Sequence, residues 1–485
     1  MNNHTDLLLV NAPSRAGVYG TLGRISAIEP PVWAGLIARY CMGRGFSVRI
    51  LDAEAEGLTC QETAQRIVDA APRLAAFCIY GHQPSASTQS MPAAIETARV
   101  LNGQSIRGDA GHIHTLALGT HPSAMPGRTL RDGFDFVAHG EGPATVVGVL
   151  EVLRDGPNFG GVLGLHYRGS LGSKLGGGLV DCVTHPAPNI MDLDAELPGQ
   201  AWELLDLKRY RAHNWHLWTG DQAGGYASVQ TSLGCPFKCS FCCINAPFTG
   251  AGAPPGIRYW SPENVVGQIQ RLVGDHGITN IKIPDEMFCL NRQHVSSICA
   301  QLITCGLGDR LNIWAYARVD TVKDDQLLER MRRSGFRWLG IGVESGSKHV
   351  RDGVEKGRFG NEQIAAAIGR VRNHGICVGA NYIFGLPDDT RESCAETLAL
   401  ACELNTEWAN FYCAMAYPGS ALHRQITQAR DPVIRTLETA FMAGQRLPED
   451  PGGPGWIGYS QHAAESLPLA TATLTAPEVI DIRDE

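Results

Sequence analysis

The sequence predicts an α/β protein with a doubly wound, Rossmann-like N-terminal domain, a partial β/α barrel and a small C-terminal extension. Two separate series of short apolar strands alternate with amphipathic helices, from Asp6 to about residue 156 and from Tyr226 to about residue 416. The stretch between them is rich in Gly and Pro, and there the periodicity fades. We therefore place the domains at residues 1–156, 157–221 (a linker), 222–420 and 421–485.

In the first series, the expected strands are DLLLV, SVRIL, LAAFCIY, TLALG and FDFVAHG, and the helices between them include PVWAGLIARYCMGRG and PATVVGVLEVLRDG. Thr59 and Glu62 form a capping box at the start of one helix, and Pro31 and Pro143 suit first-turn positions. Strands that alternate with helices pair in parallel, so we expect a doubly wound sheet. The linker contains one expected hairpin.

In the second series, the expected strands are YASVQTS, NIKIP, NIWAYARV, RWLGIGV, CVGANYIF and NFYCAMA. Helical stretches lie between them, such as SPENVVGQIQRLVGDHG and TRESCAETLALACELN. Repeated strand–helix units build a full or partial barrel that carries its functional residues at the carboxyl ends of the strands. The tail ends in the helix-like segment APEVIDIRDE.

Charge and hydropathy exclude several classes of protein. The chain has 485 residues and a formal net charge of -8, with no basic stripe of the kind that binds nucleic acid, so a nucleic-acid partner is disfavoured. No basic segment precedes the first apolar run, and no apolar stretch is long enough to span a bilayer. We expect a soluble cytoplasmic protein with no membrane partner.

Three cysteines stand apart from the other twelve of the fifteen in the chain. Most of the others are dispersed, as Cys78 is in an apolar strand, and should be reduced and buried. Cys235, Cys239 and Cys242 lie in LGCPFKCSFCC, directly after the first barrel strand. A loop with this CxxxCxxC spacing can hold a metal centre, and three thiolates leave one iron of a cubane cluster open for a small molecule. The alternatives are core cysteines, a zinc loop with a distant fourth ligand, or Cys243 in place of Cys242.

This loop resembles the signature of the radical S-adenosylmethionine (SAM) superfamily. The resemblance covers about residues 226 to 420 and implies a four-iron four-sulfur cluster on the three cysteines, whose open iron chelates SAM. It also implies reductive cleavage of SAM by an electron from an external donor such as flavodoxin or ferredoxin. The positions that match SAM contacts are Phe241 (near the adenine), Asp285 and Glu286 (amino group), Arg318 (carboxylate), Glu344 and Ser345 (ribose), and Ile383 and Gly385 (adenine).

The first domain resembles the cobalamin-binding fold that precedes the barrel in the class B methylase-like branch of this superfamily. The matching segments are PPVWAGLIARY, DAEAEGL, GTHPSAMP and HGEGP, which imply cobalamin contacts from Asp52, Glu54, Gly119, Thr120, His121, Gly140 and Glu141. A nicotinamide-binding domain would show GxGxxG after its first strand, and this chain does not. The remaining alternative is a relic flavodoxin-like domain that binds nothing.

Glu54 occupies the position of the cobalt-ligating histidine in the relatives whose loop reads DxHxxG. We expect the Glu54 carboxylate to turn toward solvent or backbone donors and to leave the lower face of cobalt without a strong protein ligand. His82 and His121 are the competing ligands, because each follows a strand of this domain.

The leading hypothesis is a cobalamin-dependent radical SAM enzyme that transfers a methyl group to an unactivated carbon or to phosphorus of a small molecule. The same resemblance allows a cobalamin-dependent cyclase or rearrangement enzyme. An RNA methylthiotransferase would carry a second cysteine triad and a basic module, neither of which is present. A nonenzymatic cobalamin or iron–sulfur sensor would not cleave SAM. Related chains usually continue past the segment that ends at Glu485, so we expect the C-terminal extension at 421–485 to be truncated.

Overall fold

The computed structural model describes residues 5–20, 23, 25–81, 83, 85–105, 112–156, 158–170, 179–219, 224–248, 256–428 and 471–484. His82 and most of the predicted extension at 421–485 lie outside this range. The chain forms two compact units, residues 1–211 with 243–260 and residues 212–242 with 261–485. Within the described residues, no helix combines the length and apolar character that crossing a membrane requires.

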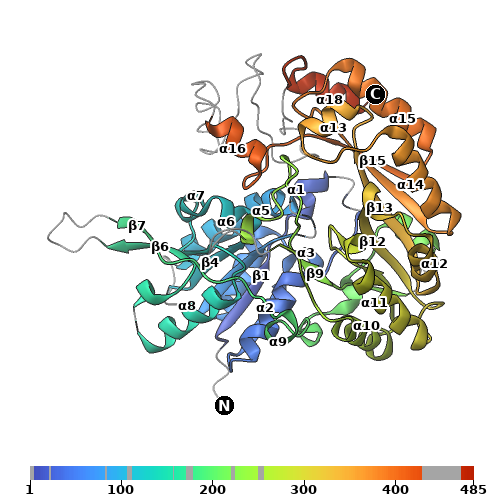
Figure 1. Cartoon of the computed structure of the whole chain (residues 1–485). Coiled ribbons are helices and arrows are strands. Elements are labelled where there is room, and N and C mark those ends of the chain that lie inside the picture. The colour runs from blue at the N-terminus through green and yellow to red at the C-terminus, as the bar shows by residue number, and fades with distance from the viewer. Residues whose placement is uncertain are drawn as a thin grey trace. The chain divides into compact units, whose positions relative to one another are not determined.

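Unit 1 is built on a seven-stranded sheet in the order β2-β1-β3-β4-β5-β6-β7 (Figure 1). Its first five strands pair in parallel, as the alternation of strands and helices predicts. They are β1 (Leu7–Asn11), β2 (Val48–Asp52), β3 (Leu74–Ile79), β4 (His114–Gly119) and β5 (Phe136–Ala138). The chain reverses its direction of winding between β1 and β3, and open α/β sheets bind ligands at the carboxyl ends of the strands at such a point.

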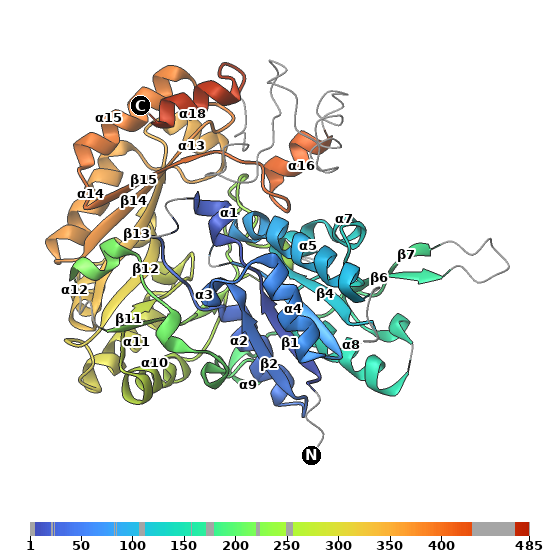
Figure 2. The same cartoon turned by 180° about the vertical axis from the view of Figure 1, so that it is seen from behind.

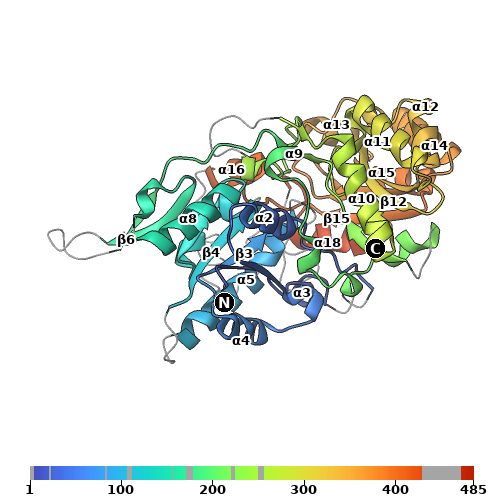
Figure 3. The same ribbon diagram turned by 90° about the horizontal axis from the view of Figure 1, so that it is seen from below.

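Helices cover both faces of this sheet, with α2 and α8 on one face and α4 and α5 on the other (Figure 3). This explains why β3 is buried along its whole length, since both of its faces lie under helices. The helices of unit 1 are α1 (Arg15–Tyr19), α2 (Val32–Met42), α3 (Ala53–Glu56), α4 (Cys60–Ala70), α5 (Ser85–Ser105), α6 (Thr120–Ala124), α7 (Pro126–Arg131), α8 (Pro143–Asp155) and α9 (Leu193–Glu196).

The structure confirms several local predictions in unit 1. Thr59 and Glu62 form the capping box of α4, and Pro143 is the first residue of α8. The expected hairpin is β6 (Leu165–Ser170) with β7 (Leu179–Val183). It joins the first sheet, because β6 pairs antiparallel with β5.

Unit 2 is built on a six-stranded parallel sheet in the order β15-β14-β13-β12-β11-β8 that curls as a partial barrel (Figure 2). The strands are β8 (Gly225–Ser228), β11 (Ile278–Lys282), β12 (Asn312–Arg318), β13 (Phe336–Glu344), β14 (Cys377–Phe384) and β15 (Trp408–Cys413). Short strands β9 (Ser232–Leu233) and β10 (Arg258–Tyr259) lie outside the two large sheets. Each predicted strand of the second series is present, so the sequence pattern predicts this sheet correctly.

The outer face of the unit 2 sheet is covered by the helices that connect its strands (Figure 1). They are α10 (Pro262–His276), α11 (Arg292–Thr304), α12 (Asp325–Arg333), α13 (Lys348–Gly353), α14 (Asn361–Asn373) and α15 (Arg391–Leu404), followed by α16 (Ala421–Gln428). The predicted C-terminal helix is α18 (Ala476–Asp484), whose Val479 packs with residues of β14 and β15. On the inner face, Trp314, Tyr316 and Trp338 pack against Trp215 of the 3₁₀ turn Asn214–Thr219.

Candidate functional site

The three predicted cluster ligands lie in the loop that follows β8 and β9. Cys235, Cys239 and Cys242 are all half-buried, and the backbone fixes the curvature of their loop. The Cys242 N–H donates to the Cys239 carbonyl oxygen at 3.0 Å, and the Ser240 N–H donates to the Val354 carbonyl at 3.1 Å. A loop held in this way presents its thiols from one short segment, as a cubane cluster requires.

The thiols themselves fit a metal centre. Burial raises the pKa of Cys235 to about 11, so without iron this residue is a neutral thiol at pH 7, and cluster assembly must release its proton. Cys243 is only 2% exposed, unlike its half-buried neighbour Cys242. This difference favours Cys242 as the third ligand.

Asp285 and Glu286 follow β11 and differ sharply in their surroundings. Asp285 is buried and accepts hydrogen bonds from the Thr231 N–H (2.9 Å), the Thr231 hydroxyl (2.6 Å) and the Ser232 hydroxyl (2.5 Å). Glu286 has no hydrogen bond or ion pair among the described residues, and burial raises its pKa to about 7 against the lowering effect of Lys356 and Lys282. Glu286 is therefore the carboxylate with capacity for the amino group of a ligand.

Glu344 ends β13 in a strained conformation, since its φ of 68° lies in the left-handed region. Its Oε1 is 2.5 Å from Nζ of Lys356, and both side chains are nearly buried. The hydroxyl of Ser345 is fully buried and lies 3.1 Å from the Thr397 hydroxyl. The structure thus brings Glu344 to the same sheet edge as Glu286, while Ser345 packs beneath that edge.

Arg318 ends β12 and contacts the cysteine loop directly. Its Nη1 is 3.8 Å from Sγ of Cys239, and its guanidinium carbon is 3.8 Å from the centre of the Phe237 ring. Its Nε is 3.0 Å from Oδ1 of Asp320. Arg318 is therefore already engaged by the chain, although the sequence predicts a pairing with the carboxylate of SAM.

The predicted adenine contacts lie together. Phe241 and Ile383 are both partly buried against one apolar cluster, which includes Val350 and Leu386. Gly385 follows β14 with a φ of 81°, a conformation that glycine adopts without strain. An aromatic ring and an aliphatic side chain that share a cluster can flank a planar base.

The predicted cobalamin contacts of unit 1 lie near the carboxyl edge of its sheet. At Gly119 (φ 142°), a Cβ would lie 1.9 Å from the Ile79 carbonyl oxygen, so this glycine is required by the close approach of β3. At Gly140 (φ 118°), a Cβ would have no neighbour nearer than the Pro247 oxygen at 3.8 Å. The positive φ of Gly140, more than steric crowding, is what requires a glycine at this position.

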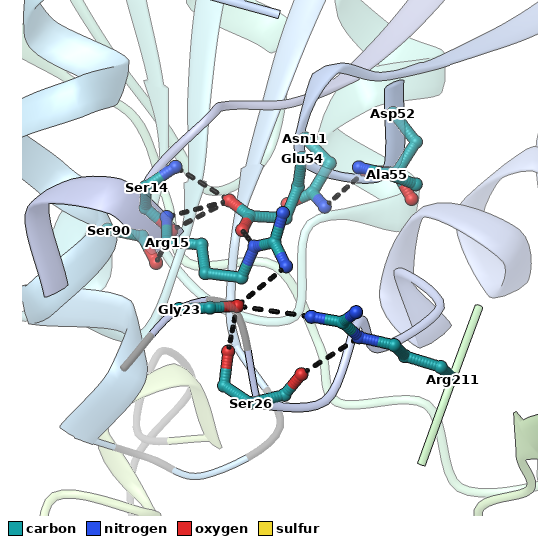
Figure 4. A network of polar contacts seen from close by, with 10 residues as sticks. All are labelled: Asn11, Ser14, Arg15, Gly23, Ser26, Asp52, Glu54, Ala55, Ser90 and Arg211. Atoms are coloured by element: carbon teal, nitrogen blue, oxygen red, sulfur yellow. Dashed lines mark hydrogen bonds and ion pairs between the residues drawn. The ribbon is translucent and has the colours of Figure 1, made fainter. Parts of the chain in front are cut away.

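Glu54 is held by the loop after β1, as Figure 4 shows. Its Oε2 accepts from the backbone N–H groups of Ser14 (2.7 Å) and Arg15 (3.0 Å), and its Oε1 is 3.2 Å from Nε of Arg15. Burial raises the pKa of Glu54, which these bonds oppose. The carboxylate turns toward backbone donors, as expected, while the ligation of cobalt stays a prediction.

Two other predicted carboxylates are satisfied within unit 1. Asp52 caps α3 and accepts hydrogen bonds from Asn11 Nδ2 (2.8 Å) and from the Tyr210 hydroxyl (2.8 Å). Burial raises the pKa of Asp52 to about 6. Glu141 forms a buried ion pair with Arg258, with Oε1 2.5 Å from Nη2. Both carboxylates therefore hold the domain together, whatever contact they make with a corrin.

Thr120 and His121 begin α6 and are both buried. The Nδ1 atom of His121 is 3.1 Å from the hydroxyl of Thr88 in α5. The backbone N–H of His121 donates to Oγ of Ser87 at 2.9 Å. The Thr88 contact orients the imidazole, and the Ser87 contact holds the start of α6.

Sequence reasoning missed Lys356 and Asp320, which hold Glu344 and Arg318 in place. Both lie in loops of unit 2, and no motif marks them. Of the two, only Asp320 could have been found from the sequence, because it lies two residues after Arg318 at the end of β12. Ser14 and Arg15 were missed in unit 1 for the same reason, since their role depends on Glu54 some 40 residues away.

Comparison with known families identifies both units. Residues 229–401 match the model of the radical SAM superfamily, and residues 20–150 match the model of the B12 binding domain. The radical SAM domain implies a four-iron four-sulfur cluster and SAM, and the B12-binding domain implies cobalamin. The cysteine loop and the Glu286 carboxylate fit the cluster and SAM.

Individual relatives agree with this assignment. An uncharacterized methyltransferase from Pyrococcus horikoshii is 26% identical over 86% of this chain and 82% of its own length. The anaerobic magnesium-protoporphyrin IX monomethyl ester cyclase of Rubrivivax gelatinosus is 25% identical over 82% of this chain, which spans 66% of the cyclase.

Among solved structures, the radical SAM methyltransferase TsrM from Kitasatospora setae, with cobalamin and a [4Fe-4S] cluster bound, is similar in fold. It superposes with a TM-score of 0.64 at 16% identity, and the match covers 88% of this chain and 80% of TsrM. At this identity the likeness concerns the fold alone. The chain thus carries a B12-binding domain ahead of a radical SAM domain.

Proposed function

We propose that this protein is a cobalamin-dependent radical SAM methyltransferase that acts on a small molecule. The observation that carries the proposal is the pairing, in one chain, of a three-cysteine loop beside the Glu286 carboxylate with a B12-binding domain. When bound, the cluster and SAM supply a radical that removes an inert hydrogen, and cobalamin supplies a methyl group. Neither cofactor does both.

The residues of the chain bind and orient these groups. Cys235, Cys239 and Cys242 would hold the cluster, and Glu286 would accept a charge-assisted hydrogen bond from the ammonium group of SAM. Phe241 and Ile383 would exclude water from the adenine. The reducing electron has to come from a partner of the flavodoxin or ferredoxin type.

The test uses protein reconstituted with iron, sulfide and cobalamin, reduced anaerobically and given SAM with a deuterated methyl group together with a metabolite extract. We expect 5′-deoxyadenosine and a metabolite that carries the deuterated methyl group, both absent with the Cys239→Ala protein. The similarity to the cyclase makes ring closure the second candidate. In that case 5′-deoxyadenosine would form and a new product would appear without the label. Failure to cleave SAM at all would contradict both and favour a sensor.

A further inference from the structure

The guanidinium of Arg318 is fixed against the cysteine loop. The side chain is buried, lies flat on the Phe237 ring, and directs Nη1 at the sulfur of Cys239, 3.8 Å away. Phe237 and Cys239 both belong to the CxxxCxxC segment, so a single cation touches the loop at two points. An N–H group aimed at a thiolate sulfur is a charge-assisted donor to a metal ligand.

The remaining donors of Arg318 are held elsewhere. Nε and Nη2 are 3.0 Å and 3.3 Å from the two carboxylate oxygens of Asp320, and Nη2 also donates to the carbonyl oxygen of Lys356. The planar guanidinium cannot turn toward a new anion without breaking these bonds together. Its position therefore suits a permanent contact with the loop better than a contact made only when SAM arrives.

We propose that Arg318 is a positioning residue that donates an N–H···S hydrogen bond to the Cys239 thiolate and thereby raises the reduction potential of the cluster. The inference rests on the proposed function, because it requires a cluster on the three cysteines. One-electron reduction adds negative charge to the cluster and its sulfurs. A nearby fixed cation stabilises the reduced form more than the oxidised form, so the electron is easier to deliver.

The test is a redox titration of anaerobically reconstituted protein without SAM, followed by electron paramagnetic resonance. We expect Arg318→Gln to shift the reduction equilibrium at least tenfold toward the oxidised form, which is about 59 mV for one electron. Arg318→Lys keeps the positive charge but not the fixed direction of the N–H group. Its reduction potential should therefore lie between those of the wild type and Arg318→Gln. Arg292→Gln is the matched control, since Arg292 is an exposed arginine of unit 2 and its loss changes the net charge equally.

Each outcome decides the question. An unchanged potential in Arg318→Gln, with weaker binding of SAM, would overturn the proposal and return Arg318 to the SAM carboxylate. A wild-type protein that holds no cluster would instead overturn the proposed function. If Arg318→Gln assembles no cluster, the reduction potential of Arg318→Lys is measured instead. A potential equal to that of the wild type would then refute a directional bond from Arg318 to the Cys239 sulfur.

A second, independent observation concerns His112, His114 and Asp135 in unit 1. Their potential ligand atoms all lie within 4.8 Å of one another, and His112 Nε2 is 3.0 Å from Oδ2 of Asp135. The N–H and hydroxyl of Thr115 donate to the same carboxylate at 2.8 Å and 3.0 Å, so it is pre-oriented.

We infer that these three residues form a binding site for a divalent metal of the zinc class. Two imidazoles and one carboxylate suit zinc, cobalt or nickel, whereas magnesium and calcium prefer oxygen ligands alone. The side chains lie at the amino ends of β4 and β5. This is the edge of the sheet opposite the predicted cobalamin residues, so the site is separate from them.

Zinc titration by calorimetry tests this site, with the cluster-loaded protein so that the cysteine loop is occupied. We expect one zinc ion per chain to be lost in His114→Ala and in Asp135→Asn, and retained in the control His185→Ala, which removes another exposed histidine of unit 1. Equal zinc binding by wild type and His114→Ala would refute the site.

Discussion

Replacing Glu286 by glutamine should stabilise the folded protein and weaken its binding of SAM. The carboxylate has no hydrogen bond or ion pair among the described residues, and burial raises its pKa to about 7 even though Lys356 and Lys282 act in the opposite direction. At pH 8 the group is ionised at a cost in free energy that a neutral amide avoids.

The size of the effect follows from the pKa. The folded protein holds this proton more tightly than the unfolded chain, where the value is 4.5, so the stabilisation is complete below pH 4.5 and is lost as the pH rises through about 7. The difference corresponds to roughly 3 kcal/mol, at about 1.4 kcal/mol for each pH unit. Because the amide is also polar, we expect Glu286→Gln to be about 1 to 3 kcal/mol more stable than wild type at pH 8, and nearly equal to it at pH 4.5.

Urea unfolding of the cluster-free protein at the two pH values measures this difference. Glu344→Gln is the matched control, because the Glu344 carboxylate lies 2.5 Å from the ammonium of Lys356, and its loss should destabilise the protein at pH 8. If Glu286→Gln were less stable than wild type at pH 8, the carboxylate would be satisfied within the fold and the argument would fail.

Removal of the Glu286 carboxylate should also weaken the binding of SAM. A charge-assisted hydrogen bond contributes about 1.5 to 3 kcal/mol, so Glu286→Ala should lower the affinity for SAM by roughly one to two decades while the cluster stays. Equilibrium titration of the reconstituted protein measures it. Unchanged affinity would show that Glu286 does not contact the cofactor.

Three further outcomes are expected. Alanine at Cys235, Cys239 or Cys242 should abolish the cluster, whereas Cys78→Ala should leave the iron content per chain unchanged. A full cluster in Cys242→Ala would shift the assignment of the third ligand to Cys243. Cobalt(II) cobalamin bound to the protein should show no nitrogen superhyperfine splitting in electron paramagnetic resonance, since Glu54 turns to backbone donors. Gly119→Ala should cost several kcal/mol of stability in thermal unfolding, because its Cβ would lie 1.9 Å from a carbonyl oxygen.

The sheets could be predicted from sequence because their signal is local. Strand β14 was expected as CVGANYIF and spans Cys377–Phe384, and the other barrel strands follow the same pattern. Strand β8 is shorter than YASVQTS, since the chain leaves the sheet after Ser228 and Thr231 donates instead to Asp285. The pairing of the hairpin with β5 was not predictable, because an edge pairing depends on distant residues.

The site was predictable in its position but not in the state of each side chain. Asp285 and Glu286 are adjacent carboxylates at one strand end, and nothing in the sequence separates them. The structure separates them through Thr231 and Ser232, which lie more than 50 residues earlier and satisfy only Asp285. The chain's own donors thus occupy one carboxylate and leave the other to a ligand.

Glu54 of unit 1 is likewise a carboxylate that is occupied by donors of the chain itself. Its carboxylate receives two backbone N–H groups and the guanidinium of Arg15 (Figure 4). A neutral imidazole has one acceptor nitrogen, so a histidine at this position could not hold the loop of Ser14 and Arg15 in the same way. The loop that follows β1 and the residue at position 54 are therefore matched to one another. Because this chain anchors the loop with a carboxylate, position 54 presents no imidazole to a bound cobalamin.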